Sequence, residues 1–523
     1  MAETITSHCA VCQKETSQKC GSCHGVYYCC REHQKADWKN HKKVCRPFKI
    51  VYTEDLGRHM VATRDIKPGE ILLKEQPLIS GPSQNTVPVC VGCYKNVDEK
   101  SRCCSKCGWP ICSEICEKAP QHIPECRYSV MRGDKVSIKN FNMIHPTYQC
   151  VTVLRCLYQK QFLPETWKKI DELQSHCEER KDTQKYEQER VNIAQFIRKF
   201  FKLESVFTEE EILKVCGIVM INSHEIPLTD TPYIALYDQA SLLEHNCSPN
   251  CSKSFTDKGY ILISAGKPIK KDEHISICYT DPLWGTPNRR QHLWDSKYFW
   301  CECHRCKDKT EFGTYFSALR CQDSNCTGFL LPETFIENSM NEKGSDWKCN
   351  ACKAKLSTYS VHDLLERIGK DLSEMPKGVI RECRSFIETY EQLLHPNHYY
   401  LTDVKLALAN MIGQEEGGLV ETSSEDFDLK LKLCRDLMSL TEKLIPGERR
   451  VRGVLLFELH ACMAEIARRN TDDPEIVKSA LMDSKKFLTE CIELLKHEPE
   501  ALPEGKIYKQ ALQNMQEFAV LKE

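Results

Sequence analysis

The chain lacks any long apolar run. No segment approaches the roughly 18 consecutive apolar residues that mark a membrane-spanning helix, and the mean hydropathy is -0.48. Residues 1–8 are polar and contain no apolar core of a secretory signal. We therefore expect neither a membrane span nor secretion, and we place the protein in the cytoplasm and nucleus.

An excess of charge of one sign is also absent. The 72 Lys and Arg residues face 74 Asp and Glu residues, which gives a formal net charge of -2. Such a chain has no global attraction for nucleic acid or for an anionic membrane, and only residues 1–50 are locally basic. No spacing matches the C-x2–4-C-x12-H-x3–5-H finger that reads DNA. The sequence argues against sequence-specific nucleic-acid binding.

Cysteine is abundant, with 33 residues among 523. A disulfide framework of this kind is typical of small secreted chains, whereas this chain is long and repeats the C-x2-C spacing. Two thiolates at that spacing can close on one face of a turn around a tetrahedral Zn²⁺. The pattern therefore favours structural zinc over disulfides.

Two compact modules, residues 9–45 and 90–126, each contain eight candidate zinc ligands. We predict interleaved pairing, in which the first and third pairs of ligands share one metal and the second and fourth pairs share the other. The first module then has Cys9, Cys12, Cys29 and His33 at one site and Cys20, Cys23, His41 and Cys45 at the other. The second has Cys90, Cys93, Cys112 and Cys116 at one site and Cys104, Cys107, His122 and Cys126 at the other.

Hydrophobic periodicity divides the rest of the chain. Residues 57–82 and 230–310 contain short strand-like runs bounded by Gly and Pro. Residues 130–225 are helical in pattern, and the charged stretch 178–190 indicates a solvated helix face. From residue 358 onward, amphipathic helices suggest an array of tetratricopeptide type, although no clean repeat of about 34 residues is present. We predict an α+β multidomain fold.

The first module carries a distinctive string of residues. Tyr28-Cys29, His33-Gln34, Asp37-Trp38 and His41 resemble the MYND finger, with His33 where that family usually has Cys. MYND fingers bind proline-rich peptides, so the resemblance implies such a partner here, with Trp38 helping to form the groove. Two alternatives stay open: a zinc-stapled fold without a partner, and a basic surface that attracts acidic partners.

Two later segments and a cysteine triplet resemble consecutive SET-domain motifs. Residues 240–250 resemble the signature, residues 275–279 the strand that ends in the active-site tyrosine, and residues 301–306 the post-SET cysteines. In that fold the signature cysteine completes the zinc site of the triplet, so the implied ligands are Cys247, Cys301, Cys303 and Cys306. A further ribbon-like quartet is Cys321, Cys326, Cys349 and Cys352, which brings the expected total to about six zinc sites.

A SET domain split by a finger and followed by helices is the layout of the SET and MYND domain (SMYD) family, which the whole chain resembles. The second finger and the ribbon-like quartet resemble its arthropod-expanded branch. The units expected are an N-terminal MYND finger (1–48), a SET domain (49–310) with an inserted MYND-like finger (90–126), a helical insert (130–225) and a post-SET zinc site (301–306), a zinc-ribbon-like segment (311–357) and a helical, tetratricopeptide-like C-terminal domain (358–523).

The resemblance implies a protein-lysine N-methyltransferase that uses S-adenosylmethionine and acts on a histone or non-histone protein. Tyr279 would place its hydroxyl beside the amine as an oriented dipole, because a phenol with a pKa of about 10 is a poor base in this role. A buried core tyrosine is the alternative. The implied cofactor residues are Gly57, Arg58, His59, Glu244, His245, Asn246, Tyr279 and Phe299.

Three positions depart from the family's pattern. His59 stands where a second glycine usually lets the backbone approach the cofactor, and Glu244 and Asn246 replace the usual Asn and Ser. An ionised Glu cannot donate a hydrogen bond, so Glu244 either pairs with the cofactor's ammonium or weakens binding. The alternative function is therefore a catalytically weak or inactive scaffold that binds proline-rich peptides.

Overall fold

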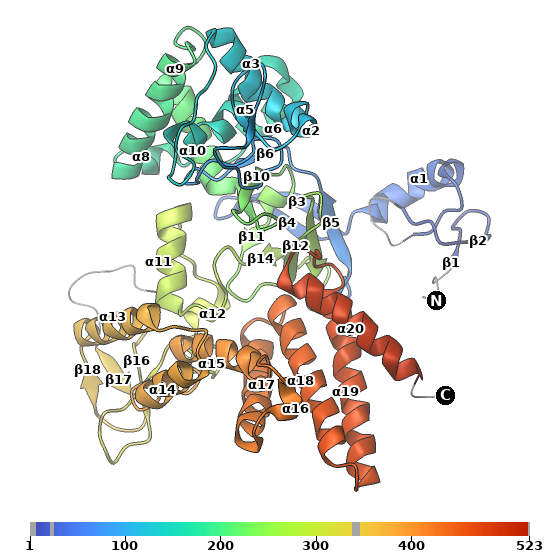
Figure 1. The fold of residues 1–523 in the computed structure, drawn as a ribbon, viewed down its shortest axis with the longest axis vertical. Coiled ribbons are helices and arrows are strands. Elements are labelled where there is room, and N and C mark those ends of the chain that lie inside the picture. The colour runs from blue at the N-terminus through green and yellow to red at the C-terminus, as the bar shows by residue number, and fades with distance from the viewer. Residues whose placement is uncertain (1–6, 21–25, 337–345, 521–523) are drawn as a thin grey trace.

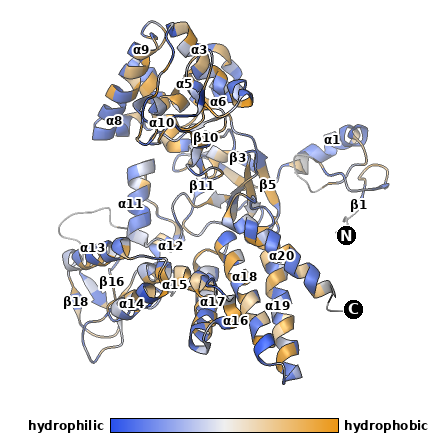
Figure 2. Cartoon of the chain, in the orientation of Figure 1, coloured by the Kyte–Doolittle hydropathy of each residue, from blue (hydrophilic) through white to orange (hydrophobic). Residues whose placement is uncertain are grey.

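The computed structural model describes residues 7–20, 26–336 and 346–520. Small sheets lie at the centre, a lobe of helices covers one end, a second helical array lies at the opposite end, and the N-terminal finger projects to the side (Figure 1). The C-terminal helices separate hydrophobic from hydrophilic residues on different sides (Figure 2). None of the helices within these ranges combines the length and the apolarity that a membrane crossing demands.

The N-terminal finger has very little apolar interior. It consists of β1 (Ser7–His8), β2 (Glu15–Thr16) and α1 (Arg31–Cys45). Among the residues described in this finger, the buried apolar cluster consists of Cys9, Cys20, Tyr28 and Cys45, with Val26 and Cys29 packed against it. A core of this size does not hold a fold together without a staple, so the arrangement depends on the ligand clusters described below.

The centre of the molecule is built from short strands. These are β3 (Phe48–Thr53), β4 (Gly57–Ala62), β5 (Ile71–Glu75), β6 (Ile79–Pro82), β9 (His224–Ile226), β10 (Tyr233–Leu236), β11 (Glu244–His245), β12 (Cys251–Phe255), β13 (Ile261–Ala265) and β14 (Ser276–Ile277). The pairs β3–β4, β12–β13–β5 and β6–β10–β9 are antiparallel, whereas β11 and β14 are parallel. The parallel pair sets Glu244 beside Ser276 and so brings the signature segment next to the strand that leads to Tyr279.

The second finger and the helical lobe share one core. Their elements are β7 (Arg102–Cys103), β8 (Pro110–Ile111), α2 (Glu114–Glu117), η1 (Pro120–His122), α3 (Ile123–Arg132), α4 (Pro146–Gln149), α5 (Val151–Phe162), α6 (Pro164–Asp171), α7 (Cys177–Arg180), α8 (Gln184–Glu189), η2 (Arg190–Gln195), α9 (Phe196–Phe200) and α10 (Glu209–Asn222). Trp109 of the finger is fully buried against Tyr148. The second finger is thus fixed to the lobe by packing.

The charged stretch at residues 178–190 is only partly a solvated face. Glu178 is exposed, as expected, but Arg180 and Glu189 are 1% and 5% exposed and form an ion pair. Both charges can be buried because each one neutralises the other. The sequence could not reveal this, because a charge run does not show which members turn inward.

The remainder of the chain is mostly helical. After η3 (Ala240–Leu242) and the last central strand come α11 (Thr286–Lys297), α12 (His304–Lys307) and the sheet β15 (Leu319–Arg320), β16 (Phe329–Leu331), β17 (Trp347–Cys349) and β18 (Lys355–Leu356). The C-terminal helices are α13 (Thr358–Glu374), α14 (Ile380–Tyr390), α15 (Tyr399–Met411), α16 (Gly418–Glu421), α17 (Ser424–Leu444), α18 (Arg450–Arg469), α19 (Pro474–Leu495) and α20 (Pro503–Val520).

The C-terminal array meets the central strands backbone to backbone. A Cβ atom on Gly266 would lie 1.8 Å from the carbonyl oxygen of Gly447, and one on Gly447 would lie 2.1 Å from that of Pro249. Nearby, the Ser254 hydroxyl donates to the carbonyl of His497 at 2.8 Å. The turn between α17 and α18 therefore fits against the signature segment only because it has no side chain there.

We expect Gly447→Ala to lower the free energy of unfolding by about 1–3 kcal/mol, because overpacking forces the backbones apart. Gly378→Ala is the matched control, since a Cβ there has no heavy atom within 4 Å. Thermal unfolding of the full chain measures both. Equal melting temperatures for the two variants would contradict the close contact.

Candidate active site and zinc centres

Five of the ligand quartets come together in space. In each, the ligand atoms lie within 4.8 Å of one another: Cys9, Cys12, Cys29 and His33; Cys90, Cys93, Cys112 and Cys116; Cys104, Cys107, His122 and Cys126; Cys247, Cys301, Cys303 and Cys306; Cys321, Cys326, Cys349 and Cys352. A Zn–S bond of about 2.3 Å in a tetrahedron places sulfur atoms about 3.8 Å apart. The Cys247–Cys301 and Cys247–Cys306 Sγ distances are 3.8 and 3.5 Å, so the quartets fit zinc.

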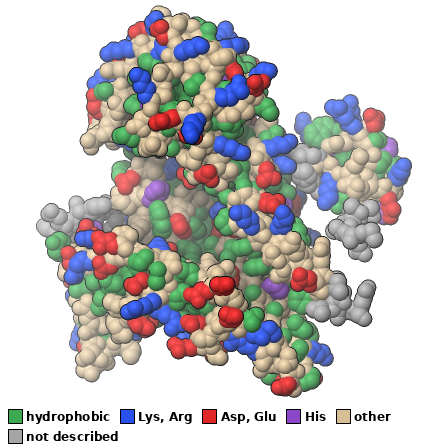
Figure 3. Space-filling view, in the orientation of Figure 1, with side chains coloured by type: hydrophobic (Ala, Val, Ile, Leu, Met, Phe, Trp, Pro, Cys, Tyr) green, Lys and Arg blue, Asp and Glu red, His purple; other side chains and the backbone are tan. Residues whose placement is uncertain are grey.

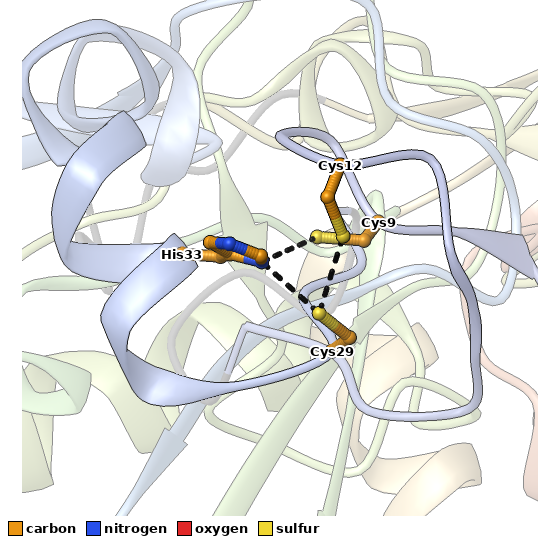
Figure 4. Close-up of side chains that lie close together, drawn as sticks. All are labelled: Cys9, Cys12, Cys29 and His33. Atoms are coloured by element: carbon orange, nitrogen blue, oxygen red, sulfur yellow. Dashed lines mark hydrogen bonds between the residues drawn. The ribbon is translucent and has the colours of Figure 1, made fainter.

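The N-terminal finger shows the interleaved arrangement directly. His33 at the start of α1 points toward Cys9 and Cys29, with Nδ1–Sγ distances of 3.6 and 3.0 Å (Figure 4). Of the other expected site, Cys20 and Cys45 lie 3.7 Å apart between Sγ atoms, and His41 is buried in the same finger. Cys23 lies outside the described residues.

The second finger has an outer layer of support around its histidine ligand. His122 Nε2 lies 3.4 Å from Cys107 Sγ, and its Nδ1 lies 2.9 Å from a carboxylate oxygen of Glu125. Glu125 is fully buried and pairs with Arg155 of α5, which also donates to the carbonyls of Ser80 and Val91. A carboxylate behind a metal-binding histidine fixes its ring and tautomer. The ligand spacing predicted the zinc site but not the Glu125 and Arg155 side chains behind its histidine.

Three buried arginines surround the Cys247 quartet. Arg289 Nη2 lies 4.0 Å from Cys306 Sγ, Arg290 donates to the carbonyl of Cys301 at 3.0 Å, and Arg305 donates to the carbonyl of Cys247 at 3.0 Å. The carboxylate of Glu311 accepts from Arg289 and Arg305 at 3.0 and 3.1 Å. These four charged residues are at most 3% exposed.

The charges of these groups balance when the quartet holds a divalent metal. Four thiolates around Zn²⁺ carry two net negative charges, and Glu311 adds a third, which the three guanidinium groups match. If all four thiols held their protons, the three guanidinium groups would outweigh Glu311 within this group of four charged residues, and excess charge is unfavourable in a protein interior. The arginine cluster is therefore compatible with zinc at the quartet, which the ligand distances also favour.

A cavity of about 670 Å³ lies beside this centre. Its wall is formed by Gly57 and Arg58 of β4, by the end of α10, by residues 241–244, by Tyr279 and by Phe299. Figure 3 shows a recess at the waist of the molecule, between the helical lobe and the C-terminal helices. The carboxylate of Glu75 accepts backbone N–H groups of residues 238–240 and so fixes the approach to the signature segment.

Tyr279 faces this cavity and is tied to its neighbours on two sides. Its hydroxyl donates to the carbonyl of Leu243, and its backbone N–H donates to His245 Nδ1 at 3.0 Å. His245 Nε2 in turn lies 3.2 Å from Cys247 Sγ. Burial and the nearby Glu244 carboxylate raise the pKa of Tyr279, so the phenol stays protonated. His245 thus connects the tyrosine to the zinc quartet and does not itself line the cavity.

His59 and Asn246 also lie away from the cavity wall. Neighbouring strand residues point to opposite faces, so Arg58 lines the cavity while the ring of His59, 1% exposed, stacks on His274 at 4.6 Å. Asn246 turns inward on its own loop and accepts from the N–H of Ser248. The obstruction that His59 suggested in the sequence is therefore not found at the wall.

Glu244, by contrast, does line the cavity. Its side chain is 14% exposed, and one carboxylate oxygen lies 2.9 Å from Nδ1 of His274. Ser223, which sequence reasoning did not select, also lines the cavity, and its hydroxyl is buried with no hydrogen-bond partner among the described residues. The cavity thus presents the Glu244 carboxylate and an unsatisfied Ser223 hydroxyl, and Glu172 and Glu225 also line it.

We expect Arg289→Met to lower the free energy of unfolding by about 3–5 kcal/mol, the typical cost of breaking a buried ion pair. It should also lower the zinc content of the purified chain. Lys307→Met is the control, because its ammonium pairs with Glu302 in solvent. Thermal unfolding and metal analysis measure the two effects, and an unchanged zinc content would contradict the charge balance.

Comparison with known proteins agrees with these features. The MYND finger model matches residues 9–45 and the SET domain model matches residues 57–280. The chain is 26% identical to SET domain-containing protein SmydA-8, isoform A, of Drosophila melanogaster, over 87% of this chain and 95% of that protein. It is 28% identical to Histone-lysine N-methyltransferase ASHR1 of Arabidopsis thaliana over 77% and 83% of the two chains.

A third relative is Histone-lysine N-methyltransferase SMYD3 of Mus musculus, 26% identical over 49% of this chain and 60% of that protein. The solved structure of Rubisco LSMT bound to AdoMet aligns over 92% of both chains at 11% identity with a TM-score of 0.27, which is too low to carry an argument. The chain therefore contains a MYND finger followed by a SET domain, and it is similar to proteins of the SET and MYND domain family.

Proposed function

We propose that the chain is an S-adenosylmethionine-dependent protein-lysine N-methyltransferase. The observation that carries the proposal is the single cavity at which Gly57, residues 241–244, Tyr279 and Phe299 meet. Relatives over most of the chain's length include proteins named histone-lysine N-methyltransferases. The substrate is a lysine of a histone or of another protein.

The residues of the cavity fit this cofactor. A volume of about 670 Å³ lies within the range of roughly 300–1,000 Å³ typical of small-molecule sites. Gly57 has a φ of 63° and open space where a Cβ would stand, so its backbone is accessible. Glu244 would hold the ammonium of the cofactor, Ser223 would supply a hydrogen bond to its polar part, and Phe299 would cover its adenine ring.

The chemistry requires a neutral amine aligned with an electrophilic methyl group, which the cofactor supplies when bound. Tyr279 contributes orientation and not proton abstraction, because burial raises its pKa. Its hydroxyl hydrogen is held by the Leu243 carbonyl, which leaves the oxygen lone pairs free to accept an N–H of the amine. Burial of this part of the wall keeps water away from the reacting groups.

A second candidate function is a binding scaffold, and one observation favours it. Trp38 of α1 is 41% exposed on a finger that projects from the body of the molecule (Figure 1). An exposed indole suits stacking on proline rings, so a proline-rich peptide is the partner we propose for this finger. We further propose that the C-terminal helices form a tetratricopeptide-like array that holds partners of the enzyme.

We expect calorimetry to detect binding of S-adenosylmethionine to the full chain. Glu244→Gln should weaken binding at least tenfold, since a hydrogen bond to a charged group contributes about 1.5–3 kcal/mol. Glu178→Gln is the control, because that side chain is 84% exposed on α7. If the wild-type chain binds no cofactor, the scaffold is the better description.

We expect Tyr279→Phe to reduce methyl transfer about 100-fold, the scale of losing one oriented dipole in a catalytic site. Cofactor affinity should not change, because the hydroxyl is bound to Leu243. Transfer of a radiolabelled methyl group to core histones and to a protein array measures the rate. Equal rates for the variant and the wild type would make Tyr279 a structural residue of the core.

A further inference from the structure

Two lysines of the chain, Lys253 and Lys297, line the candidate active site, and Lys297 lies against its tyrosine. Lys297, the last residue of α11, lines the same cavity as Tyr279 and Phe299. Its Nζ donates to the carbonyl of Ile221 at 2.6 Å and lies 5.8 Å from the centroid of the Tyr279 ring. The side chain thus reaches from α11 to the end of α10, past the tyrosine.

This lysine is partly buried. Within the described ranges, no ion pair joins Lys297 to a carboxylate, although exposed lysines such as Lys270 have one. Lys253 of β12 and Lys185 of α8 disfavour its charge. His224 and His292 also interact with it, and the carboxylates of Glu172, Glu225 and Glu244 line the same cavity. Burial, reinforced by the two neighbouring lysines, lowers the pKa of Lys297 to about 8, so a substantial fraction is neutral near physiological pH.

The properties of Lys297 are those required of a methylation substrate. A protein-lysine methyltransferase must accept a lysine side chain, lower its charge and seat it beside a tyrosine. The carbonyl of Ile221 and the face of Tyr279 already provide these contacts to Lys297. A lysine from another protein would need the same space.

We propose that Lys297 is an internal pseudosubstrate that fills the amine-accepting side of the cavity and closes it to a lysine of another protein. The inference rests on the proposed function and deepens it. In this proposal the cavity opens when the end of α11 moves. That end is held by aromatic contacts: Trp294 stacks on Trp300 with centroids 5.2 Å apart, and Tyr298, at a φ of 60°, stacks on His176. A partner that displaces these rings would free the cavity.

The first test measures where Lys297 titrates in the full chain. Lysine side chains labelled with ¹⁵N are titrated by NMR, with the Lys297 signal assigned by its loss in Lys297→Met. We expect a pKa of about 8 for Lys297 and an ordinary value of about 10.4 for the exposed Lys270. An ordinary value for Lys297 would mean that its ammonium lies in solvent and would overturn the proposal, whether or not any variant folds.

The second test measures access to the cavity with Nα-acetyl-lysine N-methylamide as the probe. Binding to Lys297→Ala should be about tenfold tighter than to the wild type, if Lys297 fills the cavity about nine-tenths of the time. Lys270→Ala is the matched control and should behave as the wild type. No gain in the Lys297 variant would overturn the proposal.

Neither readout uses S-adenosylmethionine. A chain that binds the amine probe only after Lys297→Ala but never binds the cofactor would refute the proposed enzyme and keep the internal occupant. If the chain binds the cofactor but Lys297→Ala binds the probe no more tightly than the wild type, the proposed enzyme stands and the internal occupant is refuted.

Discussion

The structure depends on the charge balance at the Cys247 quartet. Arg289, Arg290, Arg305 and Glu311 are buried around four sulfur atoms, and their charges suit four thiolates on a divalent metal. The quartet joins the signature segment to the turn after α11, and His245 relays its position to Tyr279. One metal centre therefore fixes both the catalytic candidate and the end of the helix that carries Lys297.

The ligand quartets could be predicted from the sequence because their information is local. A C-x2-C pair sets two thiolates on one turn wherever it occurs, and interleaving then follows from the order of the pairs. The fourth ligand of the triplet, Cys247, is 54 residues from Cys301, and only the resemblance to SET motifs indicated it. Ligands close together in the sequence could thus be grouped from their spacing, whereas the distant ligand Cys247 needed the resemblance to a known family.

What the sequence could not give was the direction of each side chain. His59 occupies a motif position next to the cofactor, yet the alternation along β4 turns it into the core, where it stacks on His274. Arg155 supports His122 from a helix far along the chain, and no spacing rule links them. Lys297 likewise has no motif, because its role comes from where α11 ends relative to α10.

The contact between Gly266 and Gly447 has a consequence for how such chains can diverge. Two backbones that touch without side chains leave no room for one loop to change alone. A larger residue in either turn would have to be accompanied by a shortened or shifted turn in the other. Changes in the central strands and in the C-terminal helices are thus coupled at this contact. A helical array taken from another protein would fit only if its own turn had glycine at the contact.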